Sequence, residues 1–488
     1  MSAQRHAPYR PTRAAAIRRR RRGALLAGLV GLLALAFLLH ALGGPAPLRV
    51  PVAPTMSPPP AGDPFVYRPG QDPGLTARAI AGEGQALFSA SPGGAVATAA
   101  RVARLRPLIN TAVAGSGIDP NLLEALVFVE SAGRPDVVAG GDPASAAGLT
   151  QILPATGSTM LGLHVDVSKS RALTQALGGG RSGGASATVI AGLTRRRAVV
   201  DQRFDPAHAL AATVRYLELG RSRFGRQDLA FVSYHMGMGN LSRVLDAYNG
   251  GTPVPYVQLF FGTAPDRHGA AYAVLSGFSD QSWLYYWRVL GAASLMRLYR
   301  SHPGALARLA TLQTALSSSA EVLHPPDQTP TLADPRAIAD AYASGALRPL
   351  PANAAQLGLR YASSIGADAH SLHAPAGLYR GLTPTALSLL LELAARVRTL
   401  SHGQAPLVVT SAVSDARYQR LLGTADPPAG AGWSFTLART YVGQAQANAL
   451  QAMLDRLQAL NLIAWARYPG EIEVTVASDA ARVIANGP

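Results

Sequence analysis

The sequence predicts a multidomain protein with a single N-terminal transmembrane helix, a mainly α-helical central domain and a C-terminal α+β domain. An apolar run directly after a block of arginines predicts the transmembrane helix. Apolar residues at helical spacing, interrupted by loops with Gly and Pro, fill the middle of the chain. Short strand-like runs occur together with two helical segments near the C-terminus, which favours an α+β arrangement there.

Length and composition limit the classes of protein to which the chain can belong. Its 488 residues suffice for two or three domains with sizeable cores. The absence of cysteine excludes a disulfide framework and a thiolate metal site. The formal net charge is +16, and eight arginines among residues 1–44 supply half of it. The other half suits an anionic partner such as a bacterial wall or a membrane surface, and no nucleic-acid motif accompanies it.

Residues 23–43 (GALLAGLVGLLALAFLLHALG) form an apolar run about long enough to cross the hydrocarbon core of a bilayer. The arginines at 18–22 favour a cytoplasmic location for the basic tail 1–22, so that the rest of the chain faces outward. A cleaved signal peptide is the alternative, but the run is longer than a usual h-region and no clear A-x-A site follows it. We therefore expect a single-pass protein of the inner (cytoplasmic) membrane, with a Pro-rich spacer at 44–94.

Residues 95–310 have the pattern of a helical domain without convincing strands. A Gly- and Arg-rich stretch at 164–203 looks like a long surface insertion rather than part of the core. The expected helices cover residues 96–115, 119–132, 151–162, 206–224, 227–236, 239–248 and 281–300.

A carboxylate, Glu130, lies on the apolar face of one of these helices near its end. The helix starts with Asp119 as N-cap and Pro120 at the first helical position. Glu130 shares a face with Leu123 and Val127, whose apolar side chains indicate that this face packs against the core. Burial and the negative end of the helix dipole both raise the pKa of such a carboxyl group, so it can act as an acid. The alternative is a glutamate that bends out to solvent at a frayed helix end.

Three segments of the central domain together resemble a known family. They are VESAGRPD (129–136), AAGLTQILPATG (146–157) and AFVSYHMGMGNLSRVL (230–245). Their order and spacing resemble the lytic transglycosylases of the SLT, goose-type lysozyme-like family over about residues 105–250. The resemblance implies a lysozyme-like fold, no cofactor, no metal, and peptidoglycan glycan strands as substrate.

The resemblance also implies roles for particular residues. Glu130 would be the catalytic acid and base, with Ser131 as a polar neighbour near the sugar N-acetyl group. Tyr234 would orient or stabilise the catalytic carboxylate. His235 replaces the usual Asn and is either a cleft residue or a surface histidine, and Thr150 replaces the usual Met. The segment expected to line the glycan cleft contributes Gly148, Leu149 and Gln151, of which Gln151 can hydrogen-bond the substrate, and Gly237 and Gly239 fit the glycine turn after Tyr234.

A site with one carboxylate suits a reaction in which the sugar supplies the other reacting groups. Most glycosidases use two carboxylates, and Glu130 is the one well-placed candidate of this region. The resemblance implies cleavage of the MurNAc-GlcNAc bond with formation of a 1,6-anhydro-MurNAc end. A lysozyme-type hydrolase that uses the same acid is one alternative, and a non-catalytic wall-binding or scaffold protein is another.

A connector at 311–375 precedes a second domain at 376–488. The segments LVVTSAVSDARYQRLL, GAGWSFTLA and RLQALNLIAWARYPGEIEVTV resemble the zinc D-alanyl-D-alanine carboxypeptidases over about 376–482. Alignment to the motif of that group puts Ala429 and Thr436 where two metal ligands are expected, and the third position falls on Glu473. Since a catalytic zinc needs three protein ligands, the resemblance implies a degenerate domain that binds wall stem peptides or a cell-envelope protein. A purely scaffolding domain is the alternative.

Overall fold

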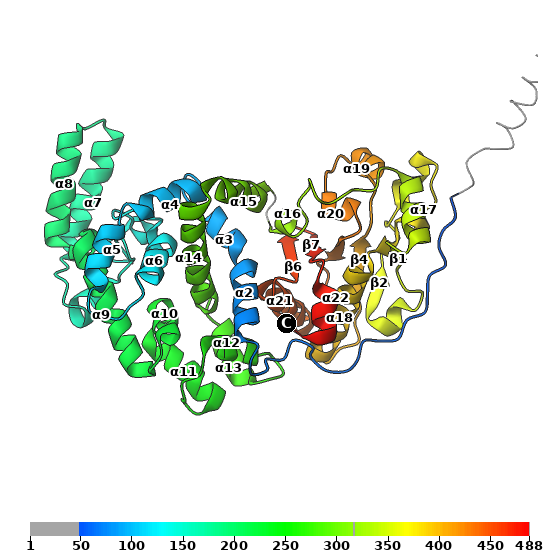
Figure 1. Cartoon of the computed structure of the whole chain (residues 1–488), viewed down its shortest axis with the longest axis horizontal. Helices are drawn as coiled ribbons and strands as arrows, with labels where there is room; N and C mark the ends of the chain where they lie inside the picture. Colours follow the sequence, from blue (N-terminus) through cyan, green and yellow to red (C-terminus); the bar gives the residue numbers. More distant parts are fainter. Residues whose placement is uncertain (1–47, 316–317, 488) are drawn as a thin grey trace, which may run out of the picture. The chain divides into compact units, whose positions relative to one another are not determined.

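The computed structural model describes residues 48–315 and 318–487. The chain divides into two units, Met1–Arg49 and Val50–Pro488, and the second contains all helices and strands described below. A helical part comes first in the sequence and a mixed α/β part follows it (Figure 1).

The described residues contain no helix that combines the length and the apolar character needed to cross a bilayer. Helix α9 (Pro206–Phe224), for example, has 19 residues but carries Arg215, Glu218 and Arg221. The expected fold class, with its single transmembrane helix, and the expected single-pass location in the inner membrane are therefore wrong for this part of the chain. The apolar run 23–43 on which both were based lies outside the described residues.

The helical part is built around α6 (Pro120–Ser131), which packs on α14 (Tyr285–Ser301). Leu123, Leu126 and Val127 of α6 are completely buried in one core with Tyr285 and Val289 of α14. The other helices of this part are α2 (Asp72–Gly82), α3 (Gly84–Ser89), α4 (Ala95–Ala103), α5 (Arg106–Val113), α7 (Val167–Ser182), α8 (Ala187–Val200), α9, α10 (Gln227–Met236), α11 (Met238–Asn249), α12 (Tyr256–Gly262), α13 (Gly269–Ser276) and α15 (Pro303–Ala315).

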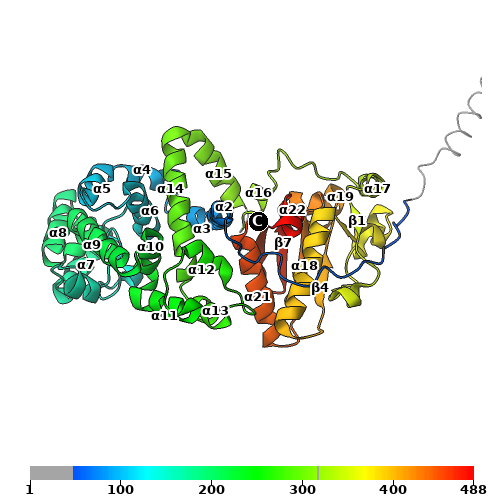
Figure 2. The same ribbon diagram turned by 60° about the horizontal axis from the view of Figure 1, so that its bottom comes forward.

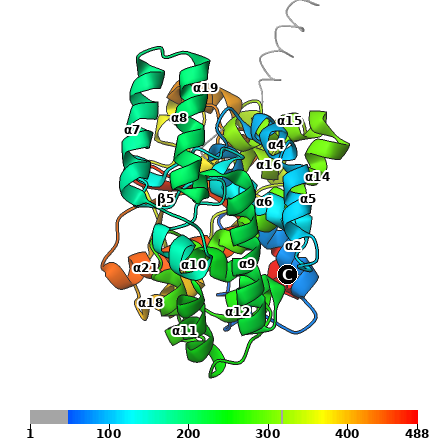
Figure 3. The same cartoon turned by 90° about the vertical axis from the view of Figure 1, so that its left-hand side faces the viewer.

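The stretch 164–203 forms a pair of helices, α7 and α8, which lie side by side (Figure 3). Each helix starts at a side chain that caps it: Asp166 accepts from the Lys169 backbone N–H, and Ser186 accepts from that of Val189. These caps outweigh the many glycines, which lower helix propensity.

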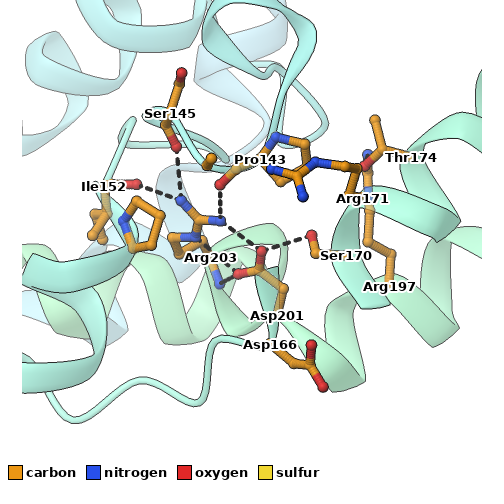
Figure 4. Close-up of polar contacts among 12 residues, drawn as sticks. Pro143, Ser145, Ile152, Asp166, Ser170, Arg171, Thr174, Arg197, Asp201 and Arg203 are labelled. Atoms are coloured by element: carbon orange, nitrogen blue, oxygen red, sulfur yellow. Dashed lines mark hydrogen bonds and ion pairs between the residues drawn. The ribbon is translucent and has the colours of Figure 1, made fainter. Parts of the chain in front are cut away.

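A buried ion pair joins this insertion to the loop at 143–152 (Figure 4). Arg203 and Asp201 are both completely buried and form a two-pronged salt bridge with N–O distances of 2.9 and 2.7 Å. The remaining guanidinium N–H groups donate to the backbone carbonyls of Pro143, Ser145 and Ile152 at 2.7, 2.9 and 3.1 Å. Because every N–H group of the Arg203 guanidinium has an acceptor, this one side chain holds the loop in a single conformation.

The C-terminal part contains a five-stranded sheet in the order β2-β4-β5-β7-β6, in which β2 and β4 are parallel and the other pairs antiparallel. Alternate residues such as Val409, Leu437 and Val474 are buried, as a sheet covered on one face requires. Its strands are β2 (Leu359–Tyr361), β4 (Leu407–Ser411), β5 (Ser434–Ala438), β6 (Ile463–Arg467) and β7 (Glu471–Val476), and β1 (Arg348–Pro349) pairs with β3 (Gly381–Leu382) separately.

Two long helices, α18 (Pro384–Ser401) and α21 (Gln444–Ala459), lie side by side and contact strands of this sheet (Figure 2). Short helices complete this part: α16 (Ala320–Leu323), α17 (Pro335–Ser344), α19 (Ala416–Leu422), α20 (Pro427–Gly430) and α22 (Ala480–Asn486).

We expect Arg203→Leu to lower the free energy of unfolding by roughly 3–5 kcal/mol, because it leaves the Asp201 carboxylate buried without its cation. Urea unfolding measures the free-energy change, and hydrogen exchange at residues 143–152 measures the loosening of the loop. Arg171→Leu is the matched control, since Arg171 pairs with Asp142 at the surface, where both side chains are about half exposed, and such a pair contributes at most about 1 kcal/mol. Equal losses from both variants would contradict the assignment.

Candidate active site

The local sequence ends α6 one residue after Glu130. Asp119 accepts a hydrogen bond from the Asn121 N–H at 2.8 Å and starts the helix. Ala132 has a left-handed backbone (φ 54°) and Gly133 follows with φ 72°, and their N–H groups bond to Phe128 and Val127 carbonyls. This C-terminal cap turns the chain away and leaves the last turn of the helix at the edge of a cavity.

Glu130 is half-buried and lines a cavity of about 570 Å³. Burial raises the pKa of its carboxyl group to about 7, against an ordinary value of 4.5. The Tyr285 hydroxyl donates to Glu130 Oε1 at 2.7 Å, and this bond opposes the rise because it favours the charged form. Near neutral pH the carboxyl group therefore exists in both protonated and ionised forms, as an acid and base require.

The structure brings four of the expected site residues to this one cavity: Glu130, Gln151, Tyr234 and His235. Gln151 has a left-handed backbone (φ 51°), and its side-chain amide donates to the Gly148 carbonyl at 2.8 Å and to that of Val137 at 3.2 Å. The side-chain amide thus fixes the loop around residue 148 by these two hydrogen bonds, while the residue lines the cavity. The rest of the lining consists of Ala139, Ala146, Ile152, Leu153, Thr156, Leu161, Tyr216, Met236, Gly237 and Asp280.

Ser131, Gly148 and Leu149 are not among the lining residues. Ser131 is buried, with its hydroxyl donating to the Val127 carbonyl at 3.3 Å, and Leu149 is part of the hydrophobic core. Gly148 has φ 82°, and a Cβ there would lie 1.8 Å from the carbonyl oxygen of Arg203. The position thus demands glycine for packing reasons, since only glycine fits both the backbone angle and the close approach.

Two tyrosines lie near Glu130, and they have different partners. We expected Tyr234 to orient the carboxylate, but its hydroxyl donates to the Thr150 carbonyl at 2.7 Å and lies 3.2 Å from Thr213 Oγ1. The hydroxyl bonded to Glu130 belongs to Tyr285, at the start of α14. Sequence reasoning placed a helix there without giving Tyr285 a role, and the aromatic cluster WLYYW at 283–287 was the available signal.

His235 is held by a short chain of hydrogen bonds. The Ser282 hydroxyl donates to Asp280 Oδ1 at 2.6 Å, so it accepts from His235 Nδ1, which lies 2.9 Å away. Burial lowers the pKa of His235, and the neutral ring then keeps its lone pair on Nε2. The imidazole also stacks on the Tyr285 ring, with centroids 4.9 Å apart.

Asp280 is a second carboxylate at the cavity that sequence reasoning missed. Partial burial raises its pKa, but hydrogen bonds from Ser282 outweigh this and keep the pKa below its ordinary value. The cavity therefore contains two kinds of carboxyl group. Glu130 has a pKa near neutral pH, whereas Asp280 is ionised. Asp280 lies in a loop between two helices, and the periodicity of helices and strands does not indicate which residues a loop side chain contacts.

A second cavity, of about 620 Å³, lies in the C-terminal part. Ala429, Thr436 and Glu473, the three positions aligned with the peptidase motif, all line it, and Thr436 pairs directly with Glu473 across β5 and β7. Burial and the nearby Asp426 raise the pKa of Glu473. No group of three or more His, Asp or Glu residues in the described ranges has an arrangement that could hold a metal ion.

A transglycosylase SLT domain model matches residues 107–175. The match includes α6 with Glu130 and the loop with Gly148 and Gln151, and it ends before Tyr234. It supports the lytic transglycosylase family, a lyase acting on peptidoglycan, with glycan strands as the substrate. No curated protein in the comparison matches the chain. The likeness of residues 376–482 to zinc carboxypeptidases stays a prediction.

Tyr285→Phe should raise the pKa of Glu130 above about 7, because the lost hydrogen bond favours the ionised carboxyl group. We expect a rise of about one unit, equivalent to roughly 1.4 kcal/mol. An NMR titration of side-chain carboxyl carbons, with Glu130→Gln to assign the resonance, measures it. Tyr286→Phe, one residue along α14, should leave that pKa unchanged. A fall after Tyr285→Phe would contradict the geometry.

Proposed function

We propose that residues 95–310 form a peptidoglycan lytic transglycosylase that cleaves the MurNAc-GlcNAc bond and leaves a 1,6-anhydro-MurNAc end. The main support is one observation: a half-buried carboxyl group with a pKa of about 7, Glu130, faces a cavity of about 570 Å³. The match of the SLT domain model to residues 107–175 supports the same function. A cavity of this size falls within the range of sites that bury most of the surface of a bound small ligand.

In the proposed reaction, Glu130 donates its proton to the bridging oxygen as the bond from that oxygen to C1 of MurNAc breaks. The carbonyl oxygen of the sugar's own N-acetyl group stabilises the positive charge that develops at C1. The Glu130 carboxylate then removes the proton from the C6 hydroxyl, and O6 bonds to C1. The proton returns to Glu130, and no water is consumed.

The other cavity residues support this cycle in the proposal. Tyr285 orients the carboxyl group and stabilises its ionised form after the first step. Gln151, Tyr234 and His235 contact the substrate. Since Ser131, Gly148 and Leu149 lie behind the wall, we assign them support of the cleft rather than contact with sugar.

Purified full-length protein incubated with intact sacculi should release muropeptides with anhydro-MurNAc ends, which are lighter by one water than hydrolysis products in mass spectrometry. Glu130→Gln should lower this release at least about a thousandfold, since the substituted side chain cannot give or take the proton. For the active protein, kcat/KM should fall as the pH rises through about 7, where the acid form is lost. Equal product release by both proteins would show that Glu130 is not the catalytic residue and would favour a scaffold role for this domain.

A lysozyme-type hydrolase is the second candidate, and Asp280 is the observation that favours it. Enzymes that add water commonly pair a protonated acid with an ionised carboxylate at one site. Asp280 is ionised and lines the same cavity as Glu130. Both oxygens of Asp280 are directed at Ser282 and His235, however, with Oδ2 lying 3.8 Å from His235 Nδ1. We therefore assign it the orientation of His235.

Asp280→Asn separates the two candidates. If Asp280 only orients His235, the variant should keep the anhydro products and lose about tenfold or less in kcat/KM, because one hydrogen-bonded contact is weakened. A hydrolase that needs this carboxylate would lose activity by orders of magnitude, and its wild-type products would contain the added water. Asp246→Asn, on α11 and outside the cavity lining, serves as the control.

We further propose that the C-terminal part binds wall stem peptides without cleaving them. All three positions aligned with the peptidase motif line its cavity of about 620 Å³, but two of them are Ala429 and Thr436, which cannot replace histidine or aspartate as metal ligands.

A further inference from the structure

A groove of about 820 Å³ lies between the helical part and the C-terminal part. One wall is formed by the segment from α13 to the start of α14, including Tyr272, Phe278 and Trp283. The other wall is formed by α21 together with Trp465 and Arg467 of β6. We call it the α13–α21 groove.

Two arginines next to the groove join the helical part to the C-terminal part. Arg456 of α21 donates to the backbone carbonyls of Phe65 and Phe261 at 2.6 and 2.7 Å. Arg396 of α18, which is almost completely buried, pairs with Asp266 at 2.9 Å. Charge-assisted contacts of this kind are strong when they are shielded from water, so the groove is a built feature of the fold.

The α21 wall alternates small residues with hydrogen-bonding side chains. Ala445, Ala449 and Ala452 leave room next to the helix, while Asn448 and Asp455 supply an amide and a carboxyl group along the same side. Gln451 donates to Asp455 Oδ1 at 2.7 Å and accepts from Arg467, while Asn448 Oδ1 accepts from Gln444 at 2.7 Å. Fixed polar groups above a floor of small residues suit a ligand rich in hydroxyl and amide groups.

Partly exposed aromatic rings line the same groove. Tyr272, Phe278, Trp283 and Trp465 are all half-buried, so each leaves part of its surface open. Trp283 stacks on Phe260 with centroids 5.4 Å apart, and the Arg467 guanidinium lies 5.3 Å from the centroid of the Trp465 ring. Rigid rings with an apolar face, set among amide and carboxyl groups, match sugars, which also have apolar faces and polar edges.

The groove adjoins the Glu130 cavity at one exposed loop. Asp280 lines the catalytic cavity, and its chain neighbours Ser279 and Gln281 line the groove. All three residues are exposed. The loop at 279–281 therefore borders both the cavity and the groove.

We infer that the α13–α21 groove is a binding site for the amino-sugar glycan strand as it continues beyond the Glu130 cavity, with α21 and β6 of the C-terminal part forming one wall. The inference rests on the proposed function, because it takes the occupant of the catalytic cavity to be such a strand. It gives the C-terminal part a role in holding long substrate.

Binding of glycan fragments to the full chain carrying Glu130→Gln tests the inference without cleavage. The probes are a GlcNAc-MurNAc disaccharide and the hexasaccharide of three such units, measured by calorimetry. We expect the hexasaccharide to bind at least tenfold more tightly than the disaccharide. Asn448→Arg, which places a bulky side chain in the groove from the exposed face of α21, should abolish this preference.

Phe278→Ala on the opposite wall should also reduce the preference, and Leu421→Arg should preserve it, since Leu421 lies exposed on α19 outside the groove. Unchanged thermal unfolding midpoints show that the variants fold. Binding that is independent of length, or a preference that survives both groove substitutions, overturns the inference.

The sacculus digest with the active protein separates this inference from the proposed function. Normal anhydro products together with length-independent binding would overturn the groove alone. Absence of such products together with a length preference that depends on Asn448 would overturn the proposed function alone.

Discussion

The hydrogen bond from Tyr285 to Glu130 is the contact on which the rest of the candidate site depends. It joins residues 155 positions apart in the sequence, and it forms because α6 and α14 pack along a common core. Tyr285 also carries the stacked ring of His235, so one tyrosine places both the carboxyl group and the imidazole. Any change in the packing of these two helices would alter the geometry of the whole cavity.

The position of Glu130 has a thermodynamic cost that fits a functional role. The pKa of its carboxyl group is about 7 in the folded protein and ordinarily 4.5, so the folded state binds this proton more tightly than the unfolded chain. The contribution of Glu130 to stability is therefore present at low pH and is lost as the pH rises through about 7. A carboxyl group kept in this state, in one cavity with an ionised Asp280, is typical of sites that transfer protons.

The shape of the cavity depends on residues that do not line it. The buried Asp201–Arg203 pair holds the loop that carries Ile152 and the neighbouring Gln151, and Gly148 allows the backbone of that loop to approach Arg203 closely. The motif glycine is thus explained by packing against Arg203, the last residue of the insertion 164–203. Family motifs of this kind combine residues that face the ligand with residues that allow the others to do so.

The sequence by itself determined the helix that carries Glu130, because cap, proline, apolar spacing and glycine are all local signals, and it indicated the α+β character of the C-terminal part. It also singled out Gln151, Tyr234 and His235, which the fold brings to the cavity of Glu130. Only the tertiary structure decided that Tyr285, rather than Tyr234, bonds the carboxyl group, that Asp280 holds His235, and that α21 faces the loop at 278–282. These contacts join residues far apart in the chain, and helix packing and buried ion pairs, which have no local pattern, select them.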